Sequence, residues 1–284
     1  MYQFPIGAMV NSFKLPLREA IVKAAEIGAQ GLQMHATFGE MSPENCVGEK
    51  RKELLDFVKS NGLVFSALCG DFGKGFANPA LNPALIEQSK RIVDMALDLE
   101  TNIVTTHIGV VPTDKNHDRY KIMQEACFEL AKYADEMGAR FAVETGPETS
   151  LVLREFLDSL DSTGVSVNMD PANLVMVTGD DPVQAVYNLK DYIVHTHAKD
   201  GIKLADGNPE YIYHAVHPVP EEYKGIKYFQ EVPLGTGRVD FPAYLRALED
   251  IGFRGFLTIE REVGSNPAAD IQIAVEFLKK TMNA

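Results

Sequence analysis

Two hydrophobic patterns alternate along the whole chain. Short apolar runs, rich in β-branched residues, are followed by longer stretches in which apolar residues recur every three to four positions. The first pattern is typical of buried strands and the second of amphipathic helices. The predicted strands are residues 4–10, 31–35, 63–68, 102–107, 140–144, 164–170, 191–197 and 255–260. The predicted helices are residues 17–27, 49–60, 84–99, 117–137, 151–160, 182–189, 241–251 and 267–282.

This order indicates an α/β fold. Strands that alternate with helices favour parallel pairing, and eight such units close as a (β/α)₈ barrel, the TIM barrel. A chain of 284 residues without a composition shift or low-complexity linker suits one such domain, which we expect over residues 1–284. A doubly wound open sheet is the alternative, and it fits less well because no GxGxxG follows an early strand.

One long connection departs from the alternation. Residues 200–239, between the seventh strand and the seventh helix, are rich in proline, tyrosine and glycine, and we predict an irregular loop over the active face. Its segment 208–230 is aromatic and exceeds a minimal connection. We expect it to form either a substrate-covering lid or a subunit contact of a homo-oligomer.

The charge narrows the class of partner. The chain carries 40 acidic against 27 basic residues, a formal net charge of −13, and contains no cluster of lysine and arginine. Such a field repels a nucleic-acid backbone and offers nothing to an anionic membrane. A small molecule is therefore the expected partner.

Targeting and redox signals indicate a cytoplasmic protein. No apolar run approaches the roughly 20 residues of a membrane-spanning helix, and the N-terminal residues lack the basic and apolar regions of a secretory signal. Cys46, Cys69 and Cys127 are widely spaced and form no CxxC motif. Reduced thiols in the cytoplasm are the simplest interpretation.

Polar residues close most of the predicted strands. In a (β/α)₈ barrel these ends form the active face, so their side chains should converge there. The residues in question are His35, His107, Glu144, Asp170, His197 and Glu260. The last four form an oxygen-rich set with one nitrogen, which suits Mn²⁺, Co²⁺ or Mg²⁺, with Zn²⁺ as an alternative.

Each of these residues also has a plain structural interpretation. A lone glutamate at a strand end is usually solvated, Asp170 before Pro171 could start a turn, and His35 and His107 could be hydrogen-bonded rim residues. Taken together, however, the structural interpretation would place several unpaired carboxyl and imidazole groups close together at the C-terminal end of the barrel. The set therefore favours a metal site.

The strand around His197 carries further polar groups. Side chains two apart share a face, so His195, His197 and Lys199 point the same way. We expect His195, one layer deeper, to be a packed, hydrogen-bonded histidine. Lys199 could bind a hydroxyl or phosphate group of the substrate, or it could form an ion pair with Asp200 or Glu262. We expect Glu262 at the rim of the barrel, in an ion pair with a basic side chain.

Five segments carry a resemblance to a known superfamily. These are residues 142–144 (AVE), 168–174 (NMDPANL), 197–200 (HAKD), 233–241 (PLGTGRVDF) and 257–260 (LTIE). They resemble the xylose-isomerase-like barrel superfamily of sugar isomerases and epimerases. It contains ketose and pentulose-phosphate 3-epimerases, inosose-converting enzymes and abasic-site endonucleases.

The resemblance implies a role for each of the four residues. In epimerase-like members, the positions of Glu144, Asp170, His197 and Glu260 hold one divalent metal ion, and the two glutamates also act as the acid/base pair. Bound to the carbonyl oxygen, the metal stabilises the enediolate that forms when a carboxylate removes the neighbouring proton. Return of the proton to the other face inverts the carbon, and return to the adjacent carbon interconverts aldose and ketose.

The chain departs from some branches of the superfamily. Three residues typical of free-ketose 3-epimerases are replaced in this chain. Their histidine is Asn173 here and their arginine is Lys203. Their second glutamate is Ser150 here, although Glu148 lies nearby in the sequence. The pattern looks more like that of the pentulose-phosphate epimerases. Abasic-site endonucleases also need the histidine that Asn173 replaces. Although His107 matches one of their ligands, the net charge of −13 further disfavours that activity.

We therefore expect a divalent-metal-dependent isomerase or epimerase acting on a sugar, sugar phosphate or sugar derivative. Glu144 and Glu260 are the expected catalytic pair. The expected substrate-binding residues are His35, His107, Asn173 and Lys199. A metal-dependent lyase or dehydratase on a keto-sugar, inosose or glycoside shares the first step and stays open, as does a catalytically silent barrel subunit.

Overall fold

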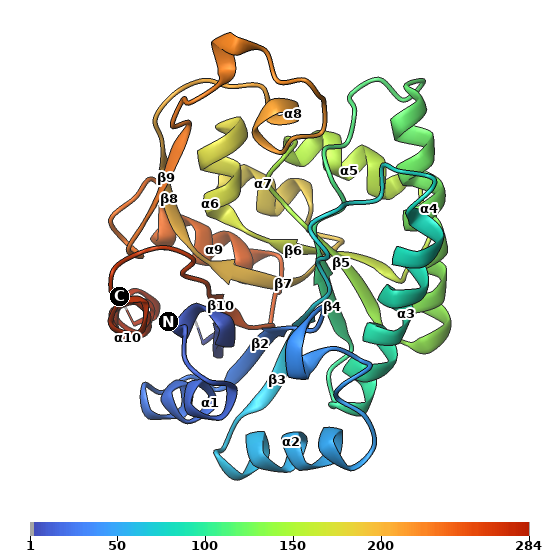
Figure 1. The fold of residues 1–284 in the computed structure, drawn as a ribbon. Coiled ribbons are helices and arrows are strands. Elements are labelled where there is room, and N and C mark those ends of the chain that lie inside the picture. Colours follow the sequence, from blue (N-terminus) through green and yellow to red (C-terminus); the bar gives the residue numbers. More distant parts are fainter. Residues whose placement is uncertain (1–2, 284) are drawn as a thin grey trace.

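The computed structural model describes residues 3–283. Within them, eight parallel strands close into a barrel in the order β1-β10-β7-β6-β5-β4-β3-β2 (Figure 1). The barrel strands are β1 (Ile6–Met9), β2 (Gly31–His35), β3 (Val64–Cys69), β4 (Ile103–Thr106), β5 (Arg140–Glu144), β6 (Val165–Met169), β7 (Ile193–Ala198) and β10 (Leu257–Ile259). The prediction of a single-domain (β/α)₈ barrel is confirmed.

Helices surround the barrel. They are α1 (Leu17–Glu26), α2 (Glu49–Ser60), α3 (Asn82–Asp98), α4 (Asp118–Met137), α5 (Ser150–Asp158), α6 (Pro171–Asn173), α7 (Pro182–Asn188), α8 (Pro209–Ile212), α9 (Phe241–Asp250) and α10 (Pro267–Met282). Helix α4 ends where the sequence predicts, because Gly138 adopts a left-handed backbone (φ 69°) and closes the last turn. Among these helices, none has the length and apolar character needed to cross a membrane.

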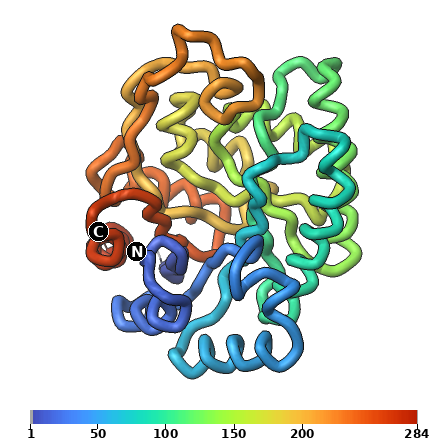
Figure 2. The backbone as a smooth tube through the Cα atoms, viewed as in Figure 1, coloured from blue at the N-terminus to red at the C-terminus, as the bar shows by residue number. Residues whose placement is uncertain are grey.

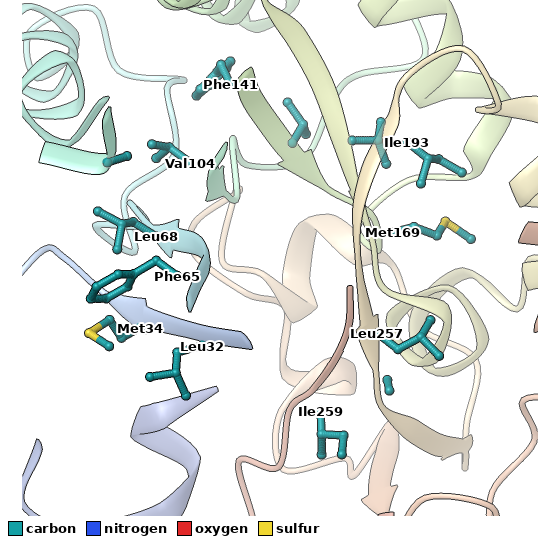
Figure 3. Close-up of a cluster of buried hydrophobic side chains, with 14 of the residues drawn as sticks. Leu32, Met34, Phe65, Leu68, Val104, Phe141, Met169, Ile193, Leu257 and Ile259 are labelled. Carbon is teal, nitrogen blue, oxygen red and sulfur yellow. The ribbon is translucent and has the colours of Figure 1, made fainter. Parts of the chain in front are cut away.

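The hydrophobic core lies between the strands and the helices. Figure 3 shows part of it, from Leu32 on β2 through Phe141 on β5 to Leu257 on β10, all fully or nearly fully buried. The barrel closes through parallel pairing of β1 with both β2 and β10. Helix α10 packs against β1, so the two ends of the described chain lie side by side (Figure 2).

The connection at 200–239 is more regular than predicted. It contains the antiparallel strands β8 (Asp200–Lys203) and β9 (Phe229–Val232), together with α8 and a 3-10 helix at Glu221–Tyr223. The expectation of an irregular stretch was therefore wrong in part, because these short elements interrupt it, although the residues between them are irregular. The two strands pair although 25 residues separate them in the sequence. A strand of only a few residues does not reveal from its own sequence which strand it pairs with. The segment stands above the barrel in orange at the top of Figure 1.

Asp200 fixes the last part of this connection, residues 235–239, by hydrogen bonds. Its carboxylate accepts hydrogen bonds from the backbone N–H groups of Gly235 (3.0 Å), Gly237 (2.9 Å) and Val239 (3.2 Å). A Cβ on Gly237 would lie 2.1 Å from Asp200 Oδ1, so this turn has no room for a side chain. The glycine turn is thereby fixed to the first residue of β8.

Candidate active site

The four predicted ligands meet at the C-terminal ends of the strands. One donor atom from each of Glu144, Asp170, His197 and Glu260 lies within 4.8 Å of all the others. Glu144 ends β5, Asp170 follows β6, His197 lies in β7 and Glu260 follows β10. Parallel strands of one barrel end at the same rim, which is why residues far apart in sequence converge here. The structure therefore contains a cluster able to hold a metal ion.

His197 lies at the centre of this cluster. Its Nδ1 is 3.5 Å from Glu144 Oε1, 3.4 Å from Asp170 Oδ2 and 3.4 Å from Glu260 Oε2. Its Nε2 lies 2.9 Å from Gln33 Oε1. Because an amide oxygen only accepts, Nε2 carries a hydrogen, and Nδ1 is the nitrogen that faces the carboxylates and is placed to bind a metal ion.

The orientation of Gln33 is itself fixed. Gln33 Nε2 donates to Thr105 Oγ1 (2.7 Å), which directs Oε1 towards His197. Asn168 Nδ2, although 3.3 Å from His197 Nε2, donates to Glu144 Oε2 (3.1 Å). Asn168 is held in turn by His195, whose Nδ1 donates to Asn168 Oδ1 (2.8 Å). A buried polar network beneath the cluster thus determines which atoms point into it.

Two buried atoms test whether a cation fits the cluster. His197 Nδ1 and Asp170 Oδ2 are fully buried and make no hydrogen bond. Buried polar atoms normally have partners, and both of these face the same point between the carboxylates. A divalent ion would satisfy both. Three carboxylates and one imidazole suit Mn²⁺, Co²⁺ or Mg²⁺ and also accommodate Zn²⁺.

The electrostatics agree with this fit. Burial by itself would lower the pKa of His197, but the carboxylates of Glu260 and Glu144 raise it well above its ordinary value. Burial would raise the pKa of Glu144, yet His107 and His197 hold it below its ordinary value. The pKa of Glu260 is likewise lowered against burial, chiefly by Lys199. The cluster is therefore ionised and attracts positive charge.

A pocket of about 610 Å³ opens beside the cluster. Its lining includes Glu144, Glu260 and three of the predicted substrate-binding residues, His107, Asn173 and Lys199. The fourth, His35, lies outside this lining, in a separate shallow pocket where its ring packs on Phe38 at 5.5 Å. The segment 208–230 contributes Ile212, Tyr213, Lys227, Phe229 and Gln230 to the pocket wall.

His107 is held between two carboxylates. Its Nδ1 lies 3.1 Å from Asp71 Oδ2 and its Nε2 lies 3.5 Å from Glu144 Oε1. Burial would lower the pKa of His107, but Glu144 and Asp71 raise it to about 10, so the ring is protonated at neutral pH. A protonated imidazole at the pocket wall can donate to a substrate oxygen.

Lys199 pairs with carboxylates rather than standing unpaired. Its Nζ donates to Glu260 Oε2 (2.8 Å) and Glu262 Oε2 (2.7 Å), and the side chain is buried. The expected pairing with Glu262 is confirmed, with Glu262 at the exposed rim. The alternative pairing with Asp200 was wrong, because backbone N–H groups occupy that carboxylate.

His195 is packed beneath the site, as predicted. Its Nδ1 donates to Asn168, and its Nε2 accepts from Thr258 Oγ1 (2.9 Å). Burial lowers the pKa of His195 to about 3, so the ring stays neutral. It therefore acts as a link in the buried network.

Sequence reasoning missed several residues around the cluster. Gln33 and Asn168 are polar positions inside apolar strands, which is a readable signal, since a buried strand tolerates such groups only with partners. Asp71 lies in the glycine-rich loop after β3, and nothing local connects it to His107. Asn173, by contrast, was predicted as a substrate-binding residue, and its Nδ2 donates to Glu144 Oε1 (3.1 Å), so its amide contacts the cluster directly.

Glu148 gives a testable pH dependence. It is buried, its Oε2 accepts from the Val111 N–H (3.3 Å), and burial raises its pKa to about 8 from an ordinary value near 4.5. Between these two values the folded state holds a proton that the unfolded state has lost. Stability should therefore fall as pH rises through this window, by up to about 1.4 kcal/mol per pH unit.

Glu148→Gln removes this titration. We expect the variant to gain stability relative to the wild type as pH rises from 5 to 8, measured by urea unfolding at both values. Groups common to both proteins cancel in the difference. Parallel pH profiles for the two proteins would contradict a buried, protonated Glu148.

With this geometry established, comparison with known proteins identifies the family. The model of the xylose isomerase-like TIM barrel family matches residues 21–281. The chain belongs to this family. Among its relatives is an inosose dehydratase of Lacticaseibacillus casei, 26% identical over 180 residues, which are 60% of this chain and 58% of that protein. The match thus spans little more than half the length of this relative.

Two further family relatives align over nearly the whole chain. A Haemophilus influenzae protein provisionally named L-ribulose-5-phosphate 3-epimerase is 23% identical over 283 residues, 93% of this chain and 90% of that protein. The crystal structure of a xylose isomerase domain protein from Planctomyces limnophilus superposes with a TM-score of 0.79 at 26% identity. The superposition covers 99% of this chain and 96% of that chain.

Proposed function

We propose that the protein is a divalent-metal-dependent isomerase or epimerase that acts on a sugar or sugar derivative. The observation that carries the proposal is the pair of buried, unpartnered atoms, His197 Nδ1 and Asp170 Oδ2, in the carboxylate cluster beside a pocket. Membership of the xylose isomerase-like family supports an enzyme acting on sugars.

Glu144, Asp170, His197 and Glu260 would hold the ion, and its charge would make a proton beside a substrate carbonyl more acidic. Glu144 and Glu260 both line the pocket, and both have lowered pKa values, so each is present as a base. One carboxylate takes the proton from carbon and can return the same proton to the neighbouring carbon, which interconverts aldose and ketose. For inversion, the other glutamate must first receive a proton, which Lys199 can supply to Glu260 (2.8 Å) or His107 to Glu144 (3.5 Å), and it then gives that proton to the opposite face of the carbon.

The groups around these glutamates hold them in place. Asn173 and Asn168 donate to the two oxygens of Glu144, and Lys199 donates to Glu260 Oε2. Fixed donors limit each carboxylate to one orientation, which proton transfer to a bound carbon requires. His107 and Lys199 can in addition donate to oxygens of the sugar.

A dehydratase is the second candidate. The observation that favours it is the protonated His107 ring beside Glu144 in the same pocket, which could protonate a departing hydroxyl group. The similarity to a protein named inosose dehydratase agrees with this alternative. Both reactions begin with removal of the same kind of proton.

The decisive experiment is hydrogen exchange in heavy water. The protein, supplied with Mn²⁺, Co²⁺ or Mg²⁺, is offered free ketoses, ketose phosphates, inososes and keto-glycosides, and deuterium at carbon is followed by NMR. Uptake with a new stereoisomer or aldose supports the proposal. Substrate loss with an unsaturated product supports the dehydratase, and metal binding without any exchange supports a catalytically silent barrel.

Gln33 provides a prediction about metal affinity. Gln33→Leu removes the acceptor that fixes the hydrogen of His197 on Nε2, so Nδ1 no longer presents its lone pair in every molecule. We expect the affinity for Mn²⁺ to fall about 10–100-fold, measured by calorimetric titration. Gln30→Leu, at the entrance of β2 and outside the cluster, is the control. Equal affinity in Gln33→Leu and wild type would contradict this role.

A further inference from the structure

We propose that the pocket selects a sugar that carries no phosphate group and bears an apolar or aromatic substituent. The inference rests on the proposed function, because it names the substrate class of the same site. Two independent features of the pocket lining support it: the pairing of its cations and the apolar character of one part of its wall.

The first feature is that the buried cations of the lining are already paired. Lys199 Nζ lies 2.8 Å from Glu260, 2.7 Å from Glu262 and 3.9 Å from Asp170. Three carboxylates therefore surround one ammonium group. A phosphate at this position would meet their negative charge before it gained a contact with Lys199.

Arg261 is similarly occupied. Its Nη1 donates to Glu231 Oε1 (2.5 Å) and its Nε donates to Asp270 Oδ2 (2.8 Å), while the side chain is 9% exposed. Arginine binds phosphate best by presenting its planar fork, and here carboxylates hold that fork. Of the other two cations in the lining, His107 is held between Asp71 and Glu144, and Lys227 is an exposed side chain that donates to Gln230 Oε1 (3.0 Å).

The charge balance leads to the same conclusion. Among the described residues that line the pocket, the four cations His107, Lys199, Lys227 and Arg261 are matched by the four carboxylates of Glu144, Glu231, Glu260 and Glu262, so the lining has no surplus of positive charge. A phosphate group carries a charge of about −1.5 to −2 at neutral pH, and it would have to displace these carboxylates to pair with Lys199 or Arg261.

The second feature is an apolar part of the wall. Met176, Ile212, Tyr213, Phe229 and Val263 line the same pocket as the cluster. Burial raises the pKa of Tyr213, which keeps its ring neutral, and Tyr213 is close enough to Lys199 to be influenced by its charge. Aromatic and aliphatic side chains of this kind pack on the apolar faces of sugars and on aryl groups.

The size of the pocket leaves room for such a substituent. Its volume of about 610 Å³ lies within the roughly 300–1,000 Å³ typical of drug-sized ligands. A glycoside with a second ring is a ligand of that size. The segment 208–230 would then select the substrate by contacting this second group, as well as enclosing the site.

Two matched pairs of probes test the inference by calorimetric binding in the presence of Mg²⁺. D-Fructose against D-fructose 6-phosphate tests the phosphate, and phenyl β-D-glucopyranoside against methyl β-D-glucopyranoside tests the substituent. We expect the wild type to bind each first member about tenfold or more tightly than its counterpart. Equal or reversed affinities in either pair would overturn the corresponding half of the inference.

Variants assign each preference to the structure. Glu262→Gln removes one carboxylate from Lys199 and should narrow the discrimination against fructose 6-phosphate, whereas the surface variant Glu249→Gln should not. Phe229→Ala should narrow the preference for the phenyl glucoside, whereas Phe38→Ala, an aromatic residue outside this pocket, should not. If neither Glu262→Gln nor Phe229→Ala changes the corresponding ligand preference, these residues do not determine substrate selection and the assignment is wrong.

Failure of this inference differs from failure of the proposed function. A ketose phosphate that exchanges deuterium faster than its free ketose leaves the isomerase or epimerase in place and overturns the inference. Selective binding of unphosphorylated sugars without exchange at carbon in any of them supports the inference and counts against the proposed function.

Discussion

Glu144→Gln and Glu260→Gln are each expected to slow formation of the new stereoisomer or aldose by about 10²–10⁴-fold. An amide cannot accept the proton from carbon, although it matches the carboxylate in size. At position 144 the amide oxygen can still accept the hydrogen bond from Asn173 that now reaches Glu144 Oε1. The rate loss should therefore greatly exceed any loss of folding stability, measured in parallel by thermal unfolding.

The two variants can also assign the two roles. A variant that still exchanges the carbon proton but forms no new stereoisomer has kept the base that removes the proton and lost the acid that returns it. Glu262→Gln is the matched control, because Glu262 accepts from the same Lys199 as Glu260 but lies outside the cluster. We expect a much smaller loss from it. Full activity of both Glu144→Gln and Glu260→Gln would refute the proposed acid/base pair.

Replacement of His197 by alanine is expected to abolish stoichiometric binding of Mn²⁺ or Co²⁺. The wild type should bind one ion and gain about 4 kcal/mol of unfolding free energy when the ion is present at 1,000 times its dissociation constant. His197→Ala should lack this gain, because it loses the only nitrogen donor among three carboxylates. Metal content after dialysis and the melting temperature with and without the ion are the measurements.

Two further variants sharpen this test. Asp170→Asn keeps an oxygen that can accept from the Asn173 N–H (2.9 Å in the wild type), so α6 stays capped while the cluster loses a charge. It should weaken metal binding without the same loss of folding. His35→Ala removes another strand-end histidine, outside the cluster, and should keep the full response to metal. If His197→Ala binds the ion and is stabilised by it to the same extent as the wild type, His197 is not a ligand and the proposed metal site is wrong.

The fold and the members of the cluster could be predicted from the sequence. Alternating strand and helix periods can be read locally, and eight repeats leave few ways to bury their apolar faces. Glu144, Asp170, His197 and Glu260 could be predicted to meet because parallel strands of a barrel end at one rim. To predict this, it was enough that each residue lies at the end of an apolar run that forms a strand.

The orientation of those groups, and which side chains line the pocket, depend on long-range contacts that the sequence does not reveal. Gln33 and His197 are 164 residues apart, yet their hydrogen bond determines which nitrogen points into the cluster. Asp71 meets His107 and β8 pairs with β9 through contacts that likewise have no local signature. Periodicity specifies which face a side chain occupies, whereas hydrogen-bond partners and charge balance depend on distances that folding alone creates.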